Sequence, residues 1–166
     1  MLMLSLEEML IRLGVAVLLG AVIGLEREFA GKDAGIRTDV VVSAGAAIFS
    51  IIAISLPYVV SLSQTHLADV IARNSGFLTV IANIVVGIGF LGGGIIIRQG
   101  LHVHSLTTAA TIWLVAAIGI LCGIGLLQFA AVSTVGLTVI LIVLRKFNLS
   151  MVISDDGDGS GKRKKK

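Results

Sequence analysis

The sequence has few charged residues for its length, a single cysteine and a single proline. Only 14% of its 166 residues are charged, whereas soluble domains carry about 25%, so a water-soluble domain or enzyme is excluded. One cysteine cannot form an internal disulfide bond, which excludes a disulfide-stabilised secreted domain. A hydrophobic fraction of 56% and a mean hydropathy of +1.03 exclude a disordered chain and leave an integral membrane protein.

Charged residues divide the chain into apolar segments of about the 20 residues that cross a bilayer. From Gln99 to Leu144 there is no Lys, Arg, Asp or Glu, and this length suits two spans divided near Gly123. The predicted spans are residues 9–25, 40–60, 77–97, 107–127 and 129–144. The sequence therefore predicts an all-α, polytopic transmembrane bundle of about five helices in residues 1–150, with four helices as the alternative.

The distribution of Lys and Arg predicts the orientation of this bundle, because cytoplasmic loops carry the excess of positive charge. We expect the N-terminus outside and the C-terminus inside. The basic residues on the expected inner side are Arg27, Lys32, Arg37, Arg98, Arg145, Lys146 and five in the tail. Residues 151–166 are predicted to form a disordered acidic and basic tail, whose basic end either binds anionic lipid or a partner, or only anchors the topology.

Polar residues gather where four predicted helix ends meet the inner face. They are Glu26, Arg27, Glu28, Arg37, Thr38, Asp39, Arg98, His102, His104, Thr107 and Thr108. Any membrane topology requires charged residues at helix ends, but the outer loops are plainer, so we expect a functional surface to lie on the inner side.

Glu26 and Arg27 are adjacent in the first predicted helix, so their side chains should point about 100° apart and be poorly placed to pair. We expect each to find a partner elsewhere, with Arg37 and Asp39 as the nearest candidates. Glu26 and Asp39 are also the candidate ligands for Mg²⁺, which prefers oxygen ligands and usually keeps several waters.

Threonines and histidines at the same face have simpler interpretations. Thr38 could cap the second helix, and Thr107 and Thr108 begin the fourth, where free N–H groups favour anions. His102-x-His104 is a weak metal signal, because the spacing does not put both rings on one helical face. The sequence contains no catalytic motif or phosphate loop, so we expect no enzymatic activity, no cofactor other than a possible Mg²⁺ ligand, and no nucleic-acid partner.

Glycine is concentrated in the predicted spans. The pairs Gly20/Gly24 and Gly119/Gly123 let helix backbones approach closely, and we favour packing within one chain over a homodimer. The densest run, in the third predicted helix, contains Gly87, Gly89, Gly92, Gly93 and Gly94. It is not a dinucleotide loop, because no strand precedes it and no acidic residue follows at the required distance. We expect either very close packing there or a loosened helix that lines a cavity.

Apart from Arg12 near the start of the first span, Asn83 is the one strongly polar side chain inside the predicted spans. A hydrogen bond to a neighbouring helix is the favoured interpretation, and ion coordination is the alternative. The fourth predicted helix offers a face that could receive it, formed by Thr111, Val115, Gly119 and Cys122.

Several motifs occur in order between about Arg12 and Arg145. They are Gly20 with Gly24-Leu25-Glu26-Arg27, then Gly35-Ile36-Arg37-Thr38, Gly45-Ala46 with Phe49, the run from Gly87 to Gly94 with Arg98, and Leu106-Thr107-Thr108-Ala109-Ala110-Thr111 with Trp113 and Ala116-Ala117-Ile118-Gly119. Together they resemble the MgtC/SapB family of bacterial inner-membrane proteins.

The resemblance implies a multi-pass inner-membrane protein with a role in magnesium homeostasis and, in pathogens, in survival under low magnesium inside host cells. It also implies regulation of other membrane proteins, including the membrane sector of ATP synthase. Longer members carry a cytoplasmic C-terminal domain, whereas only a tail follows Asn148 here, so we do not expect regulation that depends on that domain.

Two functions remain open at this point. The first is a regulatory module that binds another membrane protein through its helices and inner face. The alternative is a carrier or channel for magnesium or another ion, with a path along the glycine run and the inner carboxylates. No ionisable residue lies near the predicted midplane, and five spans do not divide into paired repeats, so we favour regulation.

Overall fold

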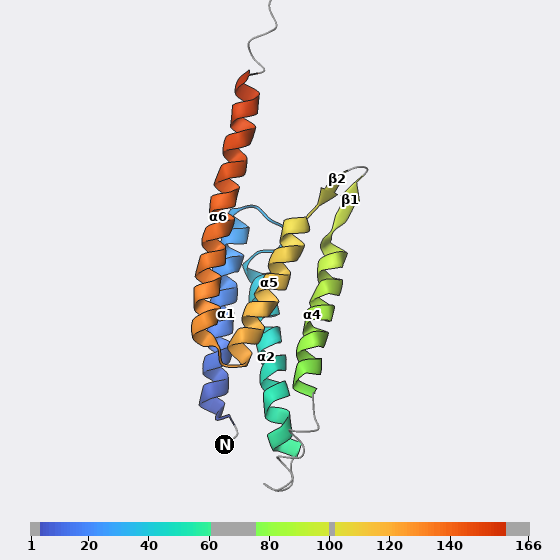
Figure 1. Ribbon diagram of the computed structural model, residues 1–166, viewed down its shortest axis with the longest axis vertical. Coiled ribbons are helices and arrows are strands. Elements are labelled where there is room, and N and C mark those ends of the chain that lie inside the picture. Colours follow the sequence, from blue (N-terminus) through green and yellow to red (C-terminus); the bar gives the residue numbers. More distant parts are fainter. Residues whose placement is uncertain (1–3, 61–75, 100–101, 159–166) are drawn as a thin grey trace, which may run out of the picture.

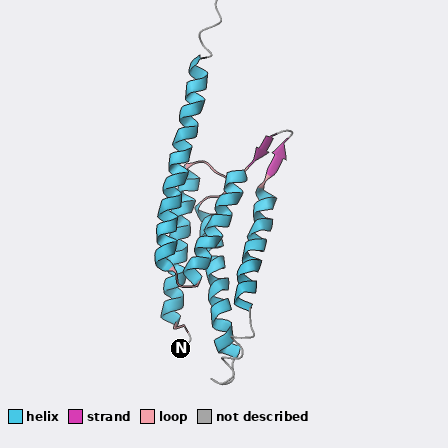
Figure 2. Ribbon diagram, in the orientation of Figure 1, coloured by secondary structure: helices cyan, strands magenta, loops and turns pink. Residues whose placement is uncertain are grey.

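A computed structural model describes residues 4–60, 76–99 and 102–158 and contains five helices arranged as a bundle (Figures 1 and 2). The helices are α1 (Leu6–Phe29), α2 (Ile36–Val60), α4 (Gly76–Ile95), α5 (Leu106–Gly123) and α6 (Leu127–Asp158). All five are long and apolar enough to cross a membrane. The prediction of an all-α, five-helix transmembrane bundle is therefore confirmed, and the four-helix alternative is wrong.

The loop between α4 and α5 contains a short element that the sequence analysis did not predict. Strands β1 (Ile97–Gln99) and β2 (His102–His104) pair in antiparallel register, with Ile97 opposite His104. Figure 1 shows this hairpin beyond the ends of α4 and α5.

Helix boundaries lie within about four residues of the predicted spans, except at the end of α6. α2 begins at Ile36, four residues before the predicted span, so its first turn includes Asp39. α6 continues to Asp158, which extends helix into the predicted tail region, whereas residues 159–166 lie outside the described part. The division of the chain at residue 150 stays a prediction.

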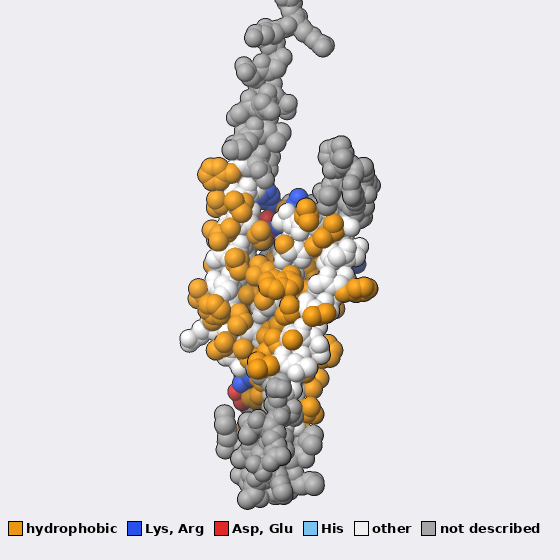
Figure 3. Space-filling model, turned by 45° about the vertical axis from the view of Figure 1, so that its right-hand side comes forward, with side chains coloured by type: hydrophobic (Ala, Val, Ile, Leu, Met, Phe, Trp, Pro, Cys, Tyr) orange, Lys and Arg blue, Asp and Glu red, His pale blue; other side chains and the backbone are white. Residues whose placement is uncertain are grey.

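Alternation of the helix directions brings the polar helix ends together. Figure 1 shows the end of α1, the start of α2, the hairpin, the start of α5 and the far part of α6 at one end of the bundle, opposite the N-terminus. The middle of the molecule is covered by hydrophobic side chains, and charged side chains lie toward its two ends (Figure 3). Which end faces the cytoplasm stays a prediction.

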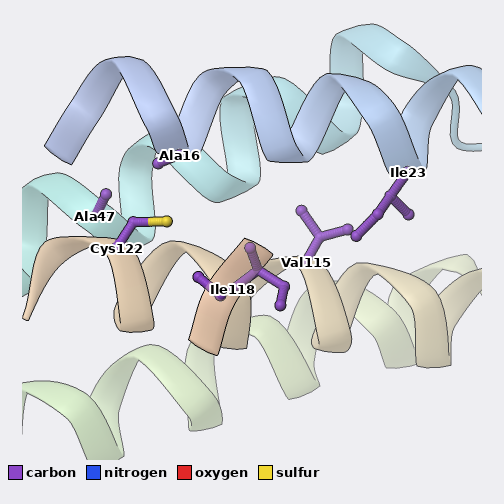
Figure 4. Packing of buried hydrophobic residues seen from close by; sticks show 7 residues of the cluster. Ala16, Ile23, Ala47, Val115, Ile118 and Cys122 are labelled. Carbon is purple, nitrogen blue, oxygen red and sulfur yellow. The ribbon is translucent and has the colours of Figure 1, made fainter. Parts of the chain in front are cut away.

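The core is formed where α1, α2 and α5 meet. Its buried residues include Ala16, Ile23, Ala47, Val115, Ile118 and Cys122 (Figure 4). α5 is the central helix, with 56% of its span buried, whereas only 6% of the α4 span is buried. Cys122 is completely buried and packs within this core.

Two of the glycine pairs pack inside the chain, as predicted. A Cβ atom on Gly24 would lie 2.5 Å from the Ile36 Cα atom, and one on Gly20 would lie 2.8 Å from the Ser43 Cβ atom. A Cβ atom on Gly123 would lie 2.6 Å from the Ala47 carbonyl oxygen. These positions accept only glycine without a shift of the neighbouring helix, so α1 and α5 both approach α2 at backbone distance.

Candidate functional site

Glu28 fixes the start of α2 at the polar end of the bundle. Its Oε2 atom accepts a hydrogen bond from the backbone N–H of Ile36 at 3.2 Å. A carboxylate at this position satisfies a free N–H group and suits the positive end of the helix dipole. The prediction that Thr38 caps α2 is therefore wrong, because the helix starts two residues earlier and Thr38 lies inside its first turn.

Glu26 forms ion pairs with two arginines. Its Oε2 atom lies 3.4 Å from Nη1 of Arg27, and its Oε1 atom lies 3.5 Å from Nη1 of Arg145 on α6. The expectation that adjacent Glu26 and Arg27 would not pair is wrong: their Cβ atoms diverge, but the long arginine side chain reaches its neighbour. Arg145 was not predicted as a partner, because nothing in the sequence indicates that this part of α6 lies beside the end of α1.

Asp39 is completely buried, and it lies against α1 at Gly20 and Gly24. Neither of its carboxylate oxygens has a hydrogen-bond partner in the described structure, and the same holds for Nε and Nη2 of Arg27. Arg27, itself only 4% exposed, is the cation whose charge acts on Asp39, although the two side chains form no ion pair. A buried carboxylate without a close counter-charge is costly, so the burial of Asp39 does not serve the stability of the fold.

Two buried carboxylates and two guanidinium groups therefore form one cluster at the polar end, the Glu26–Arg27–Asp39–Arg145 cluster. Arg37, the other expected partner, is exposed and lies outside it. As a magnesium site, the cluster offers Glu26, which already forms ion pairs with two arginines, and the buried Asp39. Among the residues that the structure describes, no three His, Cys, Asp or Glu side chains gather as a metal site would require.

The glycine run of α4 is neither closely packed as a whole nor loosened. Residues 87–94 lie within one continuous α-helix, so the prediction of a loosened backbone is wrong. Only Gly92 approaches another helix, with a Cβ atom there lying 3.5 Å from Cβ of Ala109 on α5. The four others, Gly87, Gly89, Gly93 and Gly94, are exposed, and a Cβ atom on any of them would have nothing within 4 Å.

Asn83 lines an apolar groove between α2 and α4 and is exposed. The prediction that the Thr111 face of α5 receives it is wrong. Thr111 donates its hydroxyl hydrogen to the Thr107 carbonyl oxygen at 2.8 Å, within α5 itself. Along the same face Gly119 packs against Ser43, so this face meets α2 rather than α4.

Ser105 links the turn between α1 and α2 to the start of α5. Its hydroxyl group donates a hydrogen bond to Oδ2 of Asp33, and its φ of 64° places it in the left-handed region. Thr107 is exposed and Thr108 is buried in the first turn that follows. Arg98 lies on β1, at the same end of the bundle, but its side chain falls outside the described residues. Asp33 and Ser105 were not singled out from the sequence, because a contact between residues 72 apart leaves no local pattern.

Arg12 stabilises the opposite end of the bundle. Its Nη1 atom donates a hydrogen bond to the Gly123 carbonyl oxygen at 2.9 Å, and its Nη2 atom pairs with Glu8 at 2.8 Å. The guanidinium group packs over Gly125, whose φ of +92° requires glycine. The positive charge therefore satisfies the carbonyl end of α5.

The sequence was compared with models of known protein families to identify the family of this chain. The model of the MgtC family matches residues 13–149. The chain belongs to the MgtC family. With its five apolar helices, this MgtC-family chain is a multi-pass membrane protein.

Curated relatives support the same assignment. The chain is 42% identical over 130 residues to Protein MgtC of Brucella abortus (strain 2308), covering 78% of this chain and 48% of the relative. It is 40% identical over 137 residues to Protein MgtC of Salmonella typhimurium (strain LT2), covering 82% and 52%. An uncharacterized protein of Synechocystis sp. is 42% identical over 139 residues, covering 84% and 53%. The MgtC-family chain thus spans about half the length of these relatives, and no solved structure matches it.

Proposed function

We propose that this chain is a regulatory membrane module of magnesium homeostasis, which acts by binding another membrane protein through the outward face of α4. The family membership supports the link to magnesium. The membrane sector of ATP synthase, which the sequence resemblance implied, is one partner of this kind.

The observation that carries this proposal is a third glycine pair, Gly89 and Gly93. Like Gly20/Gly24 and Gly119/Gly123, it has the spacing that lets helices approach closely. α2 packs against the other two pairs, whereas a Cβ atom on Gly89 or Gly93 would have no atom of another described helix within 4 Å. Phe90, beside them, is 87% exposed. Such a pair stabilises a membrane protein only when a second helix packs on it.

Transport is the second candidate, and the buried carboxylate of Asp39 favours it. Against it, the α1–α2–α5 interface that holds Asp39 is closed at backbone distance by Gly20, Gly24 and Gly119. Arg27 also places a positive charge beside the carboxylate, which opposes the passage of a divalent cation.

A test of partner binding compares two exposed glycines on different helices. Gly93→Ile on α4 and Gly136→Ile on α6 both add a side chain where nothing lies within 4 Å, so both variants should fold. The tagged proteins are expressed in a bacterial strain that lacks its own MgtC-family protein and are extracted in mild detergent. Gly93→Ile should lose both the co-purified membrane partner and growth in low magnesium, and Gly136→Ile should keep both. Equal behaviour of the two variants would contradict the proposal.

A flux assay separates regulation from transport. The purified chain is reconstituted in liposomes that contain a magnesium-sensitive dye, and Asp39→Asn serves as the matched variant. We expect no protein-dependent flux in either sample. A flux that the unaltered chain supports and Asp39→Asn abolishes would establish transport and overturn the regulatory proposal.

A further inference from the structure

A polar pocket opens where the chain turns from α1 into α2. It has a volume of about 320 Å³ and is lined by Glu28, Lys32, Asp33, Arg37, Thr38 and the backbone of the turn. The two membrane spans beside it end at Phe29 and begin at Ile36. The pocket therefore lies at the level where hydrocarbon gives way to lipid headgroups.

Both carboxylates of this pocket are already oriented by the protein. One oxygen of Glu28 accepts the backbone N–H of Ile36, and one oxygen of Asp33 accepts the hydroxyl of Ser105. A carboxylate has further lone pairs and a second oxygen. Each can therefore accept a hydrogen bond from a cationic ligand without losing its contact to the chain.

Both cations of the pocket are exposed, and neither forms an ion pair within the described ranges. Lys32 follows the end of α1, and Arg37 lies in the first turn of α2. A positive charge in a first turn is disfavoured by the helix dipole, so Arg37 does not serve the stability of α2. The pocket thus presents two carboxylates that hydrogen bonds hold in place and two cations that form no ion pair with any described residue. This arrangement matches a ligand that carries charges of both signs.

An apolar groove between α2 and α4 begins at Val41, about one helical turn beyond Arg37 of the pocket. Val41, Gly45 and Phe49 follow Arg37 at intervals of four residues, and all three line the groove of about 500 Å³ between α2 and α4. Asn83 is its one polar lining residue. From residue 37 to residue 49 the helix rises about 18 Å at 1.5 Å per residue, close to the roughly 15 Å of hydrocarbon in one leaflet.

We propose that the pocket and the groove together bind one phospholipid whose headgroup carries a phosphate and a primary ammonium group. Lys32 and Arg37 bind the phosphate, and Glu28 and Asp33 accept hydrogen bonds from the ammonium group. One acyl chain lies in the groove. Phosphatidylethanolamine has this chemistry. Phosphatidylglycerol has no ammonium group, and the quaternary ammonium of phosphatidylcholine has no N–H to donate.

Native mass spectrometry of the purified chain, with equimolar lipids of identical acyl chains, tests the proposal. Phosphatidylethanolamine should be retained at least tenfold more than phosphatidylcholine. Arg37→Gln should reduce its retention at least fivefold, whereas Lys146→Gln, which removes a charge from α6 outside the pocket, should not change it. Asp33→Asn, which keeps the acceptor for Ser105, should abolish the preference for phosphatidylethanolamine over phosphatidylcholine.

A second pair of variants tests the groove separately. Gly45→Leu fills it from α2, where a Cβ atom has nothing within 4 Å, and Gly136→Leu makes the same change on α6. Gly45→Leu should weaken retention at least fivefold and Gly136→Leu should not. Equal retention of all lipids, preference for phosphatidylglycerol, or indifference to Arg37→Gln or Gly45→Leu would overturn the proposal. Displacement of the lipid by micromolar free phosphoethanolamine would show a soluble ligand instead and would overturn the lipid assignment.

Discussion

Gly24→Ala is the sharpest test of the packing between α1 and α2. The added methyl group would lie 2.5 Å from the Ile36 Cα atom and 2.9 Å from the Ile36 nitrogen. Both are backbone atoms, so the first turn of α2 must move, and overpacking of this kind costs about 1–3 kcal/mol or more. Alanine regains about 1 kcal/mol in helix propensity. The free energy of unfolding should therefore fall by up to about 2 kcal/mol, and by more if α2 cannot shift.

Gly93→Ala is the matched control, because its methyl group meets no atom within 4 Å. Only the higher helix propensity of alanine acts there, so the free energy of unfolding of this variant should rise by up to about 1 kcal/mol. Reversible unfolding of the purified chain in mixed micelles, followed by circular dichroism, measures both free energies. Gly24→Ala that is as stable as Gly93→Ala would refute the close approach of α1 and α2.

Five further variants probe polar contacts, and the melting temperature of each in detergent is compared with that of the unaltered chain. Arg27→Gln should cost about 3–5 kcal/mol, because it removes a buried partner of the buried Glu26 carboxylate. Arg145→Gln should cost about 1 kcal/mol or less, because Arg145 is 39% exposed. Equal losses would contradict the assigned cluster. Arg12→Gln should cost about 1.5–3 kcal/mol through its lost charge-assisted hydrogen bond, and an unchanged melting temperature would exclude that bond. Ser43→Ala should cost about 1 kcal/mol, because it removes a hydrogen bond between α1 and α2. Ser50→Ala removes a hydrogen bond within its own helix and should cost less. A larger loss for Ser50→Ala than for Ser43→Ala would be inconsistent with the structure.

The number and type of the helices could be predicted from the sequence, because the cost of exposing polar groups to hydrocarbon gives spans a fixed apolar length. The packing of Gly20/Gly24 and Gly119/Gly123 against another helix of the same chain was also predicted, because small residues at this spacing let a helix backbone approach closely. The sequence does not contain the rotation of each helix about its axis. That rotation turns Gly89 and Gly93 outward and leaves only Gly92 in contact with α5.

The charged residues of the polar end could be predicted to share one end but not to form particular pairs. Residue spacing on a helix describes Cβ directions, and it failed for Glu26 and Arg27 because a long side chain can bend back to its neighbour. Arg145 joined the cluster through the packing of α6 on α1, which only the tertiary structure defines. The cap of α2 was assigned to Thr38 because the helix start was placed too late; Glu28 reaches it from the preceding helix.

The central claim is that the polar helix ends all lie on one side of the membrane, the cytoplasmic side. Single-cysteine labelling tests this claim most directly. Cys122 is buried and is replaced by alanine, and new cysteines are placed at Glu8, Lys32 and Lys146. A membrane-impermeant maleimide should label the Lys32→Cys and Lys146→Cys variants only in inverted vesicles, and the Glu8→Cys variant only in intact spheroplasts. Labelling of Lys32→Cys and Lys146→Cys from opposite sides of the membrane would contradict the account.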